Sequence, residues 1–260
     1  MIRTAITAVT LLFGTFIFGS LVLLAEVFGV AKRPGSVFER APVWWSRWVL
    51  RAAGVTVVLK GNDDLPAGSP RVFVANHVSW FDILAMYDVL PHYGFVAKRE
   101  LEKIPLFGAA ARAVGTIYID RENLKAAFSA YEDATSKIRA GQSVAVYPEG
   151  TRGERYGLRP FKKGPFVLAI GAGVPIVPVV IHGTIAVNPR GEFRASPGVV
   201  HIQLLDPIPT DGLTYDDRDA LAEQTRSRMA DCLREEYGVT PALEPRHSPR
   251  AAPIGQEISA

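Results

Sequence analysis

The first apolar run of the chain is long and uncharged, unlike the shorter runs that follow it. Residues 5–25 contain no Asp, Glu, Lys or Arg, and a helix needs about 20 apolar residues to cross the hydrocarbon core of a bilayer. A secretory signal peptide has a shorter apolar region, of about 7–15 residues, that ends at a small-residue cleavage site. Glu26, Val27 and Phe28 follow without such a site. The run therefore predicts a retained membrane helix, with a buried core helix as the alternative.

The next helical pattern, over residues 41–54, is amphipathic. One face carries tryptophans and apolar side chains and another carries arginines: Trp44, Trp45, Trp48, Val49 and Ala52 against Arg47 and Arg51. Tryptophan beside arginine is typical of a helix that lies at the membrane–water interface. A helix that faces the protein core, with ordinary solvated arginines, fits the pattern equally well.

From residue 54 the pattern changes to short β-rich runs, several of them apolar throughout, as in strands covered on both faces. They lie at residues 55–59, 71–75, 95–97, 116–119, 143–147, 176–181 and 199–205. Helical periodicity lies between them, at 122–141 and 215–238, and each of these two stretches ends in a glycine. This alternation predicts an α/β fold, a mostly parallel sheet flanked by helices. Pro178 predicts an edge or an irregular pairing in its strand, because proline has no N–H to donate.

These patterns divide the chain into three parts. Residues 1–53 hold the membrane helix and the interfacial helix, and residues 54–240 form the α/β domain. Residues 241–260 are rich in Pro, Ala and polar residues, and this composition predicts a disordered tail.

Charge and composition narrow the choice of partners. Arg3 alone precedes the first apolar run, whereas five cations follow it: Lys32, Arg33, Arg40, Arg47 and Arg51. The positive-inside rule then places the downstream chain on the cytoplasmic face of the cell membrane. The single cysteine, Cys232, excludes a disulfide within the chain and favours a reducing compartment. Its position on the helical stripe of residues 215–238 predicts a core residue.

Metal, nucleotide and nucleic-acid chemistry are not indicated. The five histidines form no i, i+4 pair and there is no cysteine cluster to complete a metal site: His77, His92, His182, His201 and His247. No glycine-rich phosphate loop of the nucleotide-binding kinds is present. The formal net charge is only +3, and no nucleic-acid-binding module can be identified.

Polar clusters follow three of the predicted strands. Asn76 and His77 follow residues 71–75, Asp120 and Arg121 follow 116–119, and the sequence PEGTR follows 143–147. In open α/β sheets, ligands bind outside the carboxyl ends of the strands. If the three strands are parallel neighbours, the three clusters converge on one site.

The first cluster places a carboxylate five positions after a histidine. If the chain turns between them, Asp82 can hold one ring nitrogen of His77 while the other takes a proton from a substrate hydroxyl. A purely structural hydrogen-bonded pair is the alternative. Ser79 lies outside any Gly-x-Ser-x-Gly elbow, so we expect it to cap the following helix rather than to act as a nucleophile.

The third cluster suits an anion. Gly150 frees the backbone, Thr151 offers a hydroxyl, and Arg152 offers a fork of N–H donors for a phosphate or carboxylate. More cations follow, either as phosphate contacts or as part of a solvated loop: Arg155, Arg159, Lys162 and Lys163.

Four blocks, in order, resemble those of the glycerolipid acyltransferases, the PlsC-like lysophosphatidic acid acyltransferase group. "NHVSWFD" (76–82) resembles the N-H-x-x-x-x-D motif, and "GTIYIDR" (115–121) resembles the second block. "YPEGTRG" (147–153) resembles the third, E-G-T-R block, and "VPIVPVVIHG" (174–183) resembles the fourth. "KRELEKIPLFG" (98–108) and "FKKG" (161–164) are also similar. The blocks cover roughly residues 70–185.

The resemblance implies a glycerol-3-phosphate-acyltransferase-like fold and a role for each matching residue. His77 is the implied general base and Asp82 its partner, with Asn76 as a supporting residue. The E-G-T-R block implies acceptor-phosphate binding by Glu149, Gly150, Thr151 and Arg152, to which Arg121 and Lys98 add basic positions. Because a carboxylate repels a phosphate, we expect Glu149 to orient Arg152 or the loop backbone. The fourth block is expected to shape the core or the acyl pocket.

The implied activity is acyl transfer from an acyl thioester, carried by coenzyme A or acyl carrier protein, to the free hydroxyl of a lysophospholipid. The acceptor best matched is 1-acylglycerol-3-phosphate, which gives phosphatidate in phospholipid biosynthesis at a bilayer, without a cofactor. The same chemistry on another acceptor, such as a lyso-ornithine lipid, is the close alternative. A thioester or ester hydrolase and a catalytically silent membrane-binding protein are the others.

Overall fold

The computed structural model describes residues 1–61, 65–66, 68–90, 93–120 and 124–240. The predicted disordered tail, residues 241–260, lies outside the described residues. So do His92, Arg121 and His247, which are named above.

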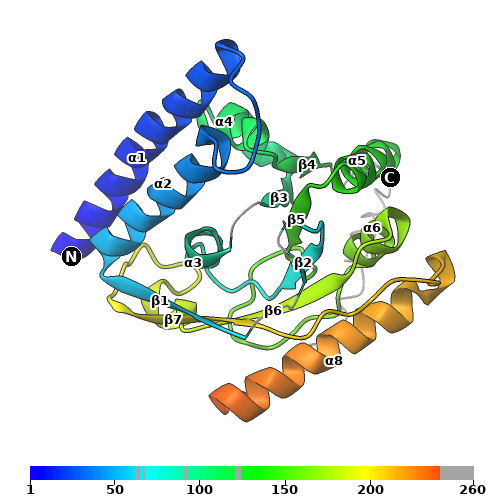
Figure 1. The fold of residues 1–260 in the computed structure, drawn as a ribbon. Helices are drawn as coiled ribbons and strands as arrows, with labels where there is room; N and C mark the ends of the chain where they lie inside the picture. Colours follow the sequence, from blue (N-terminus) through cyan, green and yellow to red (C-terminus); the bar gives the residue numbers. More distant parts are fainter. Residues whose placement is uncertain (62–64, 67, 91–92, 121–123, 241–260) are drawn as a thin grey trace, which may run out of the picture.

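Seven strands form one sheet in the order β1-β7-β6-β2-β5-β3-β4 (Figure 1). They are β1 Val55–Lys60, β2 Val72–Ala75, β3 Tyr93–Lys98, β4 Ile117–Ile119, β5 Ser143–Val146, β6 Ile176–His182 and β7 Gly198–Leu204. All seven predicted strands are therefore confirmed. Five of the six pairings are parallel, and only β6 and β7 run antiparallel, so the predicted mostly parallel sheet is confirmed as well.

Helices cover both faces of this sheet, which explains why its strands are apolar throughout. On one face, α2 (Val37–Ala53) and α3 (Phe81–Val89) pack against β2, β6 and β7. On the other face lie α5 (Leu124–Arg139), α6 (Gly164–Ala172) and α8 (Arg218–Tyr237). Two short helices, α4 (Phe107–Ala113) and α7 (Thr184–Val187), follow β3 and β6, and 3₁₀ turns span Arg99–Lys103 and Tyr215–Asp217.

The predicted helix ends and core residue in the second half of the domain agree with the structure. Gly238 caps α8 with a positive φ of 63°, a conformation that glycine adopts at little cost. Gly141 likewise has a φ of +103° just after α5. Cys232 is buried in the α8 core face, and burial raises the pKa of its thiol to about 11. It is a core residue, as predicted.

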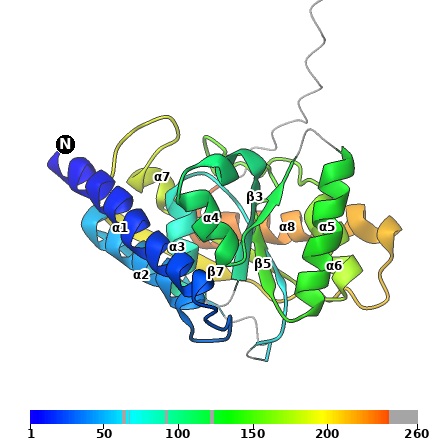
Figure 2. The same cartoon turned by 90° about the horizontal axis from the view of Figure 1, so that it is seen from above.

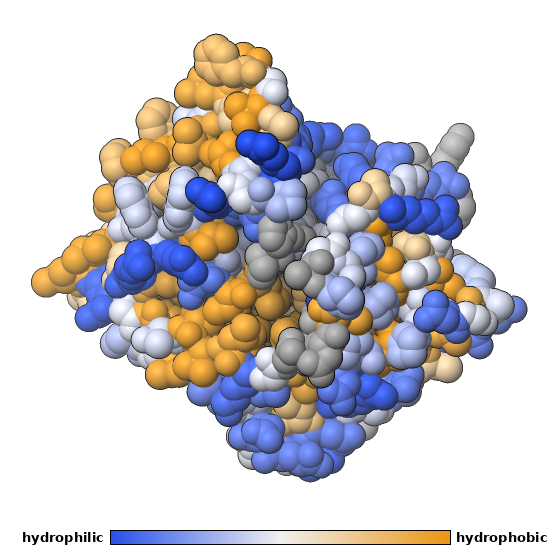
Figure 3. Space-filling model, in the orientation of Figure 1, coloured by the Kyte–Doolittle hydropathy of each residue, from blue (hydrophilic) through white to orange (hydrophobic). Residues whose placement is uncertain are grey.

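The N-terminal helix α1 (Ile2–Val27) lies alongside α2 on one flank of the molecule (Figures 1 and 2). One stripe of α1 packs against α2 and α4, where Gly14 meets Trp45 and Gly19 meets Leu106. The other stripe exposes large apolar side chains: Ile2, Ile6, Val9, Leu12, Phe13, Phe16 and Leu24. In Figure 3 apolar side chains gather along this flank. The helix is long and apolar enough to cross a membrane, and its exposed apolar stripe rules out a helix buried in the core.

The core-facing interpretation of the amphipathic helix is confirmed for one side of α2, and the membrane-interface interpretation stays a prediction. Val49 is buried in the domain core and Trp45 packs against it, while the Trp45 indole N–H donates to Thr15 of α1 at 3.1 Å. Trp44 and Trp48 are instead 40% and 42% exposed beside Phe18 of α1. One side of α2 is therefore a core helix, and the edge beside α1 carries exposed tryptophans.

Pro178 lies inside the sheet, because β6 is flanked by β2 and β7. The prediction of an edge position is wrong, but the alternative, irregular pairing, is correct. The β6–β7 ladder pairs Val179 with Leu204, and the next bridge pairs Ile176 with Ile208. Between these two pairs, β6 spans three residue steps (179 to 176) and the segment that continues β7 spans four (204 to 208). The extra residue forms a bulge opposite Pro178, where no N–H is needed.

Candidate active site

The strand order brings two of the three predicted polar clusters together. Strands β2 and β5 are parallel neighbours, so Asn76 and His77 lie next to the loop that begins at Tyr147. The cluster after β4 does not meet the condition of neighbouring strands, because β3 lies between β5 and β4, so its place in the site stays a prediction. Asp120, at the end of β4, lies 3.7 Å from the Arg99 guanidinium.

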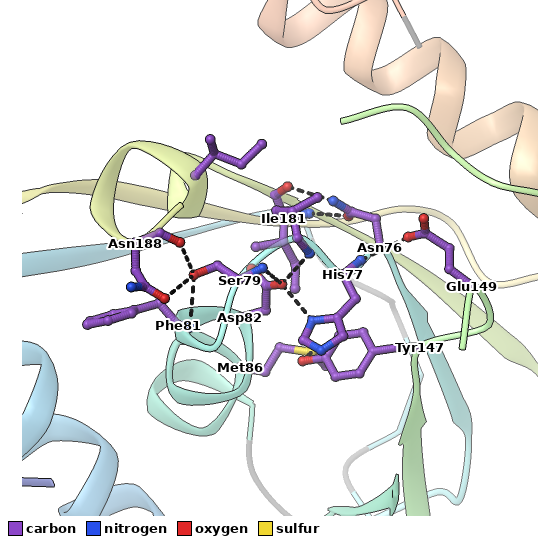
Figure 4. A network of polar contacts seen from close by, with 12 residues as sticks. Asn76, His77, Ser79, Phe81, Asp82, Met86, Tyr147, Glu149, Ile181 and Asn188 are labelled. Atoms are coloured by element: carbon purple, nitrogen blue, oxygen red, sulfur yellow. Dashed lines mark hydrogen bonds and ion pairs between the residues drawn. The ribbon is translucent and has the colours of Figure 1, made fainter. Parts of the chain in front are cut away.

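His77 and Asp82 form the pair that the sequence predicted (Figure 4). His77 Nδ1 lies 2.7 Å from Asp82 Oδ2. The His77 side chain is 13% exposed, whereas the Asp82 side chain is fully buried. Among the described residues, Nε2 makes no hydrogen bond, so the ring is held by one nitrogen and presents the other.

The first turn of α3 fixes the Asp82 carboxylate through contacts other than the one with His77. Oδ2 also accepts the backbone N–H groups of Val78 and Ser79 at 2.7 and 2.8 Å. Asp82 lies in the first helical turn, where the helix dipole favours a negative charge. These donors fix the orientation of Oδ2 toward the imidazole ring.

Tyr147 is a site residue that the sequence reasoning missed. Its ring stacks on the His77 imidazole, with centroids 4.0 Å apart and planes inclined by 14°. Phe95 stacks on the other side of Tyr147 at 5.6 Å, and the Tyr147 hydroxyl meets Met86 sulfur at 3.5 Å. Burial raises the pKa of Tyr147 well above 10, so the phenol is neutral. An aromatic residue at the end of β5, directly before the PEGTR sequence, was the available signal.

Glu149 holds the backbone of the histidine loop. Its Oε1 accepts the His77 backbone N–H at 3.0 Å, and its Oε2 accepts the Arg159 N–H at 3.5 Å. Gly153 of the same loop donates its N–H to the His77 carbonyl at 2.7 Å, so both backbone polar groups of His77 bond to the loop after β5. Burial raises the pKa of Glu149 from 4.5 to about 7, although the two N–H donors lower it. Of the two expected partners, Arg152 and the loop backbone, Glu149 contacts the loop backbone.

Asn76 and Ser79 secure the remainder of the histidine loop. The Asn76 side-chain amide exchanges two hydrogen bonds with the Ile181 backbone, at 2.9 and 2.7 Å, and so extends the pairing of β2 and β6 by one residue. Ser79 is fully buried and donates its hydroxyl to the Asn188 carbonyl at 2.8 Å. Its oxygen accepts the Phe81 N–H at 3.3 Å, but Trp80 occupies the N-cap position of α3. The predicted structural role agrees with these contacts, and the predicted capping position is wrong by one residue.

The E-G-T-R loop places its arginine beside the histidine loop. The Arg152 guanidinium lies 4.6 Å from the centroid of the Trp80 ring, in cation–π geometry. Gly150 has a φ of +75°, and a Cβ there would lie 2.7 Å from Lys162 Cε. The positive φ favours glycine at this position, and a Cβ would displace only the end of the Lys162 side chain. The Thr151 side chain is exposed.

The other predicted basic positions lie further along the sheet. Lys98 ends β3 and forms an ion pair with Glu100 at 2.7 Å. Strand β5 separates it from the strand that leads to His77, so its proposed phosphate contact stays a prediction. Arg121 lies outside the described residues.

The geometry suits proton abstraction from a bound hydroxyl. A neutral imidazole with one nitrogen on a buried carboxylate is the arrangement of a general base. The one serine in the loop uses its hydroxyl to hold Asn188, so the nucleophile in this arrangement is the substrate's own oxygen.

Comparison with known proteins identifies this class of catalyst. Residues 56–182 match the family model described as Acyltransferase. The chain is 39% identical to human 1-acyl-sn-glycerol-3-phosphate acyltransferase alpha over 184 residues, which are 70% of this chain and 65% of that protein. It is 35% identical to the human beta form over 211 residues, 79% of this chain and 76% of that protein. The chain belongs to the acyltransferase family that contains the 1-acyl-sn-glycerol-3-phosphate acyltransferases.

A solved structure shows the same fold. The 1-acyl-sn-glycerophosphate acyltransferase of Thermotoga maritima superposes with a TM-score of 0.73 at 24% sequence identity, over 90% of this chain and 97% of that one. Against the alpha relatives, the aligned part spans slightly less than two thirds of the relative's length, 65% in the human protein.

Proposed function

We propose that this protein transfers a fatty acyl group from an acyl thioester to the free hydroxyl of 1-acylglycerol-3-phosphate, giving phosphatidate. The observation that carries the proposal is the 2.7 Å contact between His77 Nδ1 and Asp82 Oδ2 at the carboxyl end of β2. The names of the family members support the acceptor, since both human relatives are 1-acyl-sn-glycerol-3-phosphate acyltransferases.

The reaction needs one base and no enzyme nucleophile. His77 Nε2 takes the proton of the acceptor hydroxyl as its oxygen attacks the thioester carbonyl carbon. The carbon–sulfur bond of the resulting tetrahedral intermediate then breaks. The departing thiolate receives the proton from the imidazolium, so the products are an ester and a free thiol, and His77 returns to its neutral form.

Asp82 and Glu149 act on His77 rather than on the substrate. The buried Asp82 carboxylate fixes the tautomer that presents Nε2 and stabilises the imidazolium. Glu149 binds the His77 backbone N–H, so we assign it to loop orientation instead of phosphate contact. Asn76 supports the same loop through Ile181.

The E-G-T-R loop binds the acceptor phosphate in this proposal. Arg152 supplies the guanidinium, which suits a phosphate because of its planar fork of donors, and Gly150 and Thr151 shape the loop beside it. Lys98 and Arg121 are assigned as additional phosphate contacts by their positions in the neighbouring blocks.

Membrane attachment follows from the N-terminal helices. The exposed apolar stripe of α1 and the exposed Trp44 and Trp48 of α2 suit a bilayer and its interface. The excess of Lys and Arg after α1 supports a cytoplasmic position for the α/β domain, where both acyl-coenzyme A and acyl carrier protein are available as donors.

The test is product analysis with purified protein in mixed micelles. Acyl-coenzyme A and acyl-acyl carrier protein are each supplied with and without 1-acylglycerol-3-phosphate, and lipids are identified by mass spectrometry. We expect phosphatidate that depends on the acceptor and a matching amount of free thiol. Free fatty acid without any acceptor product would instead assign a hydrolase. A parallel reaction with lyso-ornithine lipid identifies the alternative acceptor.

A further inference from the structure

The loop that follows α7 is fastened to the histidine loop. Its first residue, Asn188, accepts the Ser79 hydroxyl on its backbone carbonyl at 2.8 Å and is 9% exposed (Figure 4). Further along, the Ser196 N–H returns to the Val187 carbonyl at 2.9 Å. The loop from Asn188 to Ser196 therefore begins and ends beside α7. Its first residue is bound to Ser79, which lies three positions before Asp82 in the sequence.

The Asn188 side chain folds this loop. Its amide nitrogen donates to the carbonyls of Glu192 and Arg194, at 3.1 and 2.8 Å. Within the loop the Glu192 N–H bonds to the Pro189 carbonyl at 3.2 Å, and Gly191 has a φ of +84°. This is the pattern of a type II turn, which requires a positive φ at its third residue. Arg190 is the second residue of the turn, at its tip.

The turn brings Arg190 to the E-G-T-R loop. Its guanidinium lies 3.8 Å from Glu154 Oε1, two residues after Arg152. Burial lowers the pKa of Arg152, and the neighbouring Arg190 lowers it further. The two guanidinium groups thus repel one another. The turn after α7 is visible beside the N-terminus of α1 in Figure 2.

The Arg152 and Arg190 guanidiniums are two positive charges on separate loops, and an anion between them would reduce their repulsion. Within the described part of the chain, Arg152 forms no ion pair with a carboxylate, and its contact is the Trp80 ring. The partner of Arg190, Glu154, is 78% exposed, and such surface pairs contribute little stability. The Asp82 carboxylate offsets part of the repulsion on Arg152, and a phosphate between the two guanidiniums would neutralise the remainder.

We infer that Arg190 is a further phosphate-binding residue of this site, acting with Arg152 on the headgroup of the acceptor lipid. The inference rests on the proposed function and deepens it, because it adds a residue outside the four blocks. It also accounts for the buried Asn188, whose side chain builds the turn that carries Arg190. The shared chemistry is a phosphate group, which the acceptor carries and which an acyl-coenzyme A donor carries too.

The experiment compares steady-state kinetics of the full chain and three variants. Arg190→Ala should raise the KM for lysophosphatidate roughly tenfold, the effect of one lost charged contact, with the KM for acyl-coenzyme A unchanged. Arg190→Lys should restore part of the loss. Arg194→Ala is the matched control, because Arg194 lies on the same loop, 52% exposed and paired with Glu192, and should leave both KM values unchanged.

Each outcome separates the inference from the proposed function. An unchanged KM for lysophosphatidate in Arg190→Ala overturns the role of Arg190, and so does a rise confined to acyl-coenzyme A, which would assign it to the donor. If the wild type makes no phosphatidate, the proposed function fails, and the inference is judged by equilibrium binding of lysophosphatidate: equal affinity of wild type and Arg190→Ala overturns it. If the two arginines share one phosphate, Arg152→Ala and Arg190→Ala should be non-additive in the double variant.

Discussion

The imidazole of His77 and the guanidinium of Arg152 lie in one site, yet the structure holds them by different means. The imidazole half, which comprises His77, Asp82, Tyr147 and Glu149, is held by buried hydrogen bonds and a stacked ring. The guanidinium half, which comprises Trp80, Arg152 and Arg190, is held by a cation–π contact and one long ion pair. Its tryptophan is 49% exposed.

This difference assigns separate kinetic roles to the two halves. A group that transfers a proton must hold its geometry through the reaction, so its loss lowers kcat. Cations that bind a headgroup act equally before and during the reaction, so their loss raises KM. The five changes below test this division, from the largest expected effect to the smallest.

His77→Ala removes the general base and should lower kcat by roughly 10²–10⁴-fold or more. The KM for lysophosphatidate should stay within about twofold of its wild-type value, because the guanidinium half is intact. Steady-state assays give both values, and thermal unfolding checks that the variant folds. A large rise in KM with normal kcat would contradict the division.

Asp82→Asn removes a charge with little change in shape and should lower kcat roughly 10²–10³-fold. Its amide oxygen can still accept the Val78 and Ser79 N–H groups, and its nitrogen can occupy the Oδ1 position, which has no partner among the described residues. The matched control is Asp88→Asn on the same helix, where the carboxylate pairs with Arg47 at 2.7 Å. Equal activity of the two variants would show that Asp82 is only structural.

Glu149→Gln should alter how stability depends on pH. The pKa of Glu149 is about 7 in the fold against 4.5 as its ordinary value. The folded state therefore binds the proton more tightly, and its stabilising contribution is complete below pH 4.5 and lost as the pH rises through 7. The change corresponds to about 3 kcal/mol. The glutamine amide of the variant cannot ionise, so the wild type should lose about that much more free energy of unfolding than the variant between pH 4.5 and 8, measured by urea denaturation in micelles.

Arg152→Ala should raise the KM for lysophosphatidate roughly tenfold and leave kcat within about threefold of wild type. Arg155→Ala serves as the control, since Arg155 lies on the same loop and is exposed. If both variants bind the acceptor normally, the phosphate is held elsewhere.

Trp80→Leu should have the smallest effect. A partly exposed cation–π contact is worth roughly 0.5–1 kcal/mol, so the KM for lysophosphatidate should rise about two- to fivefold, and less in Trp80→Phe, which keeps an aromatic ring. A loss of kcat as large as that of Asp82→Asn would place Trp80 in the imidazole half instead.

The sheet was predictable because its strands are continuous apolar runs, and the His77–Asp82 pair was predictable from its spacing at the end of one. The strand order was not. A run such as 116–119 carries no signal that β3 separates it from β5, since that order depends on how helices cross over the sheet. The sequence therefore did not show that a strand separates the Asp120 cluster from the loop after β5.

Two further features depend on contacts between segments distant in sequence. Arg190 sits in a Pro-Arg-Gly stretch that resembles any exposed turn, and its position depends on Ser79, more than a hundred residues away. Glu149 could be excluded from phosphate contact on charge grounds, but its actual partner, the His77 N–H, required the β2–β5 pairing. Local patterns predicted elements and residue chemistry, while partners required the fold.

The stack of Tyr147 on His77 has a spectroscopic consequence. Protons held over the face of an aromatic ring are shielded by its ring current, and at a centroid separation of 4.0 Å the carbon-bound protons of this imidazole should resonate upfield of those of a solvated histidine. Nuclear magnetic resonance can then follow the charge of the base directly, without substrate or turnover. Tyr147→Leu would move that signal back downfield and so assign it.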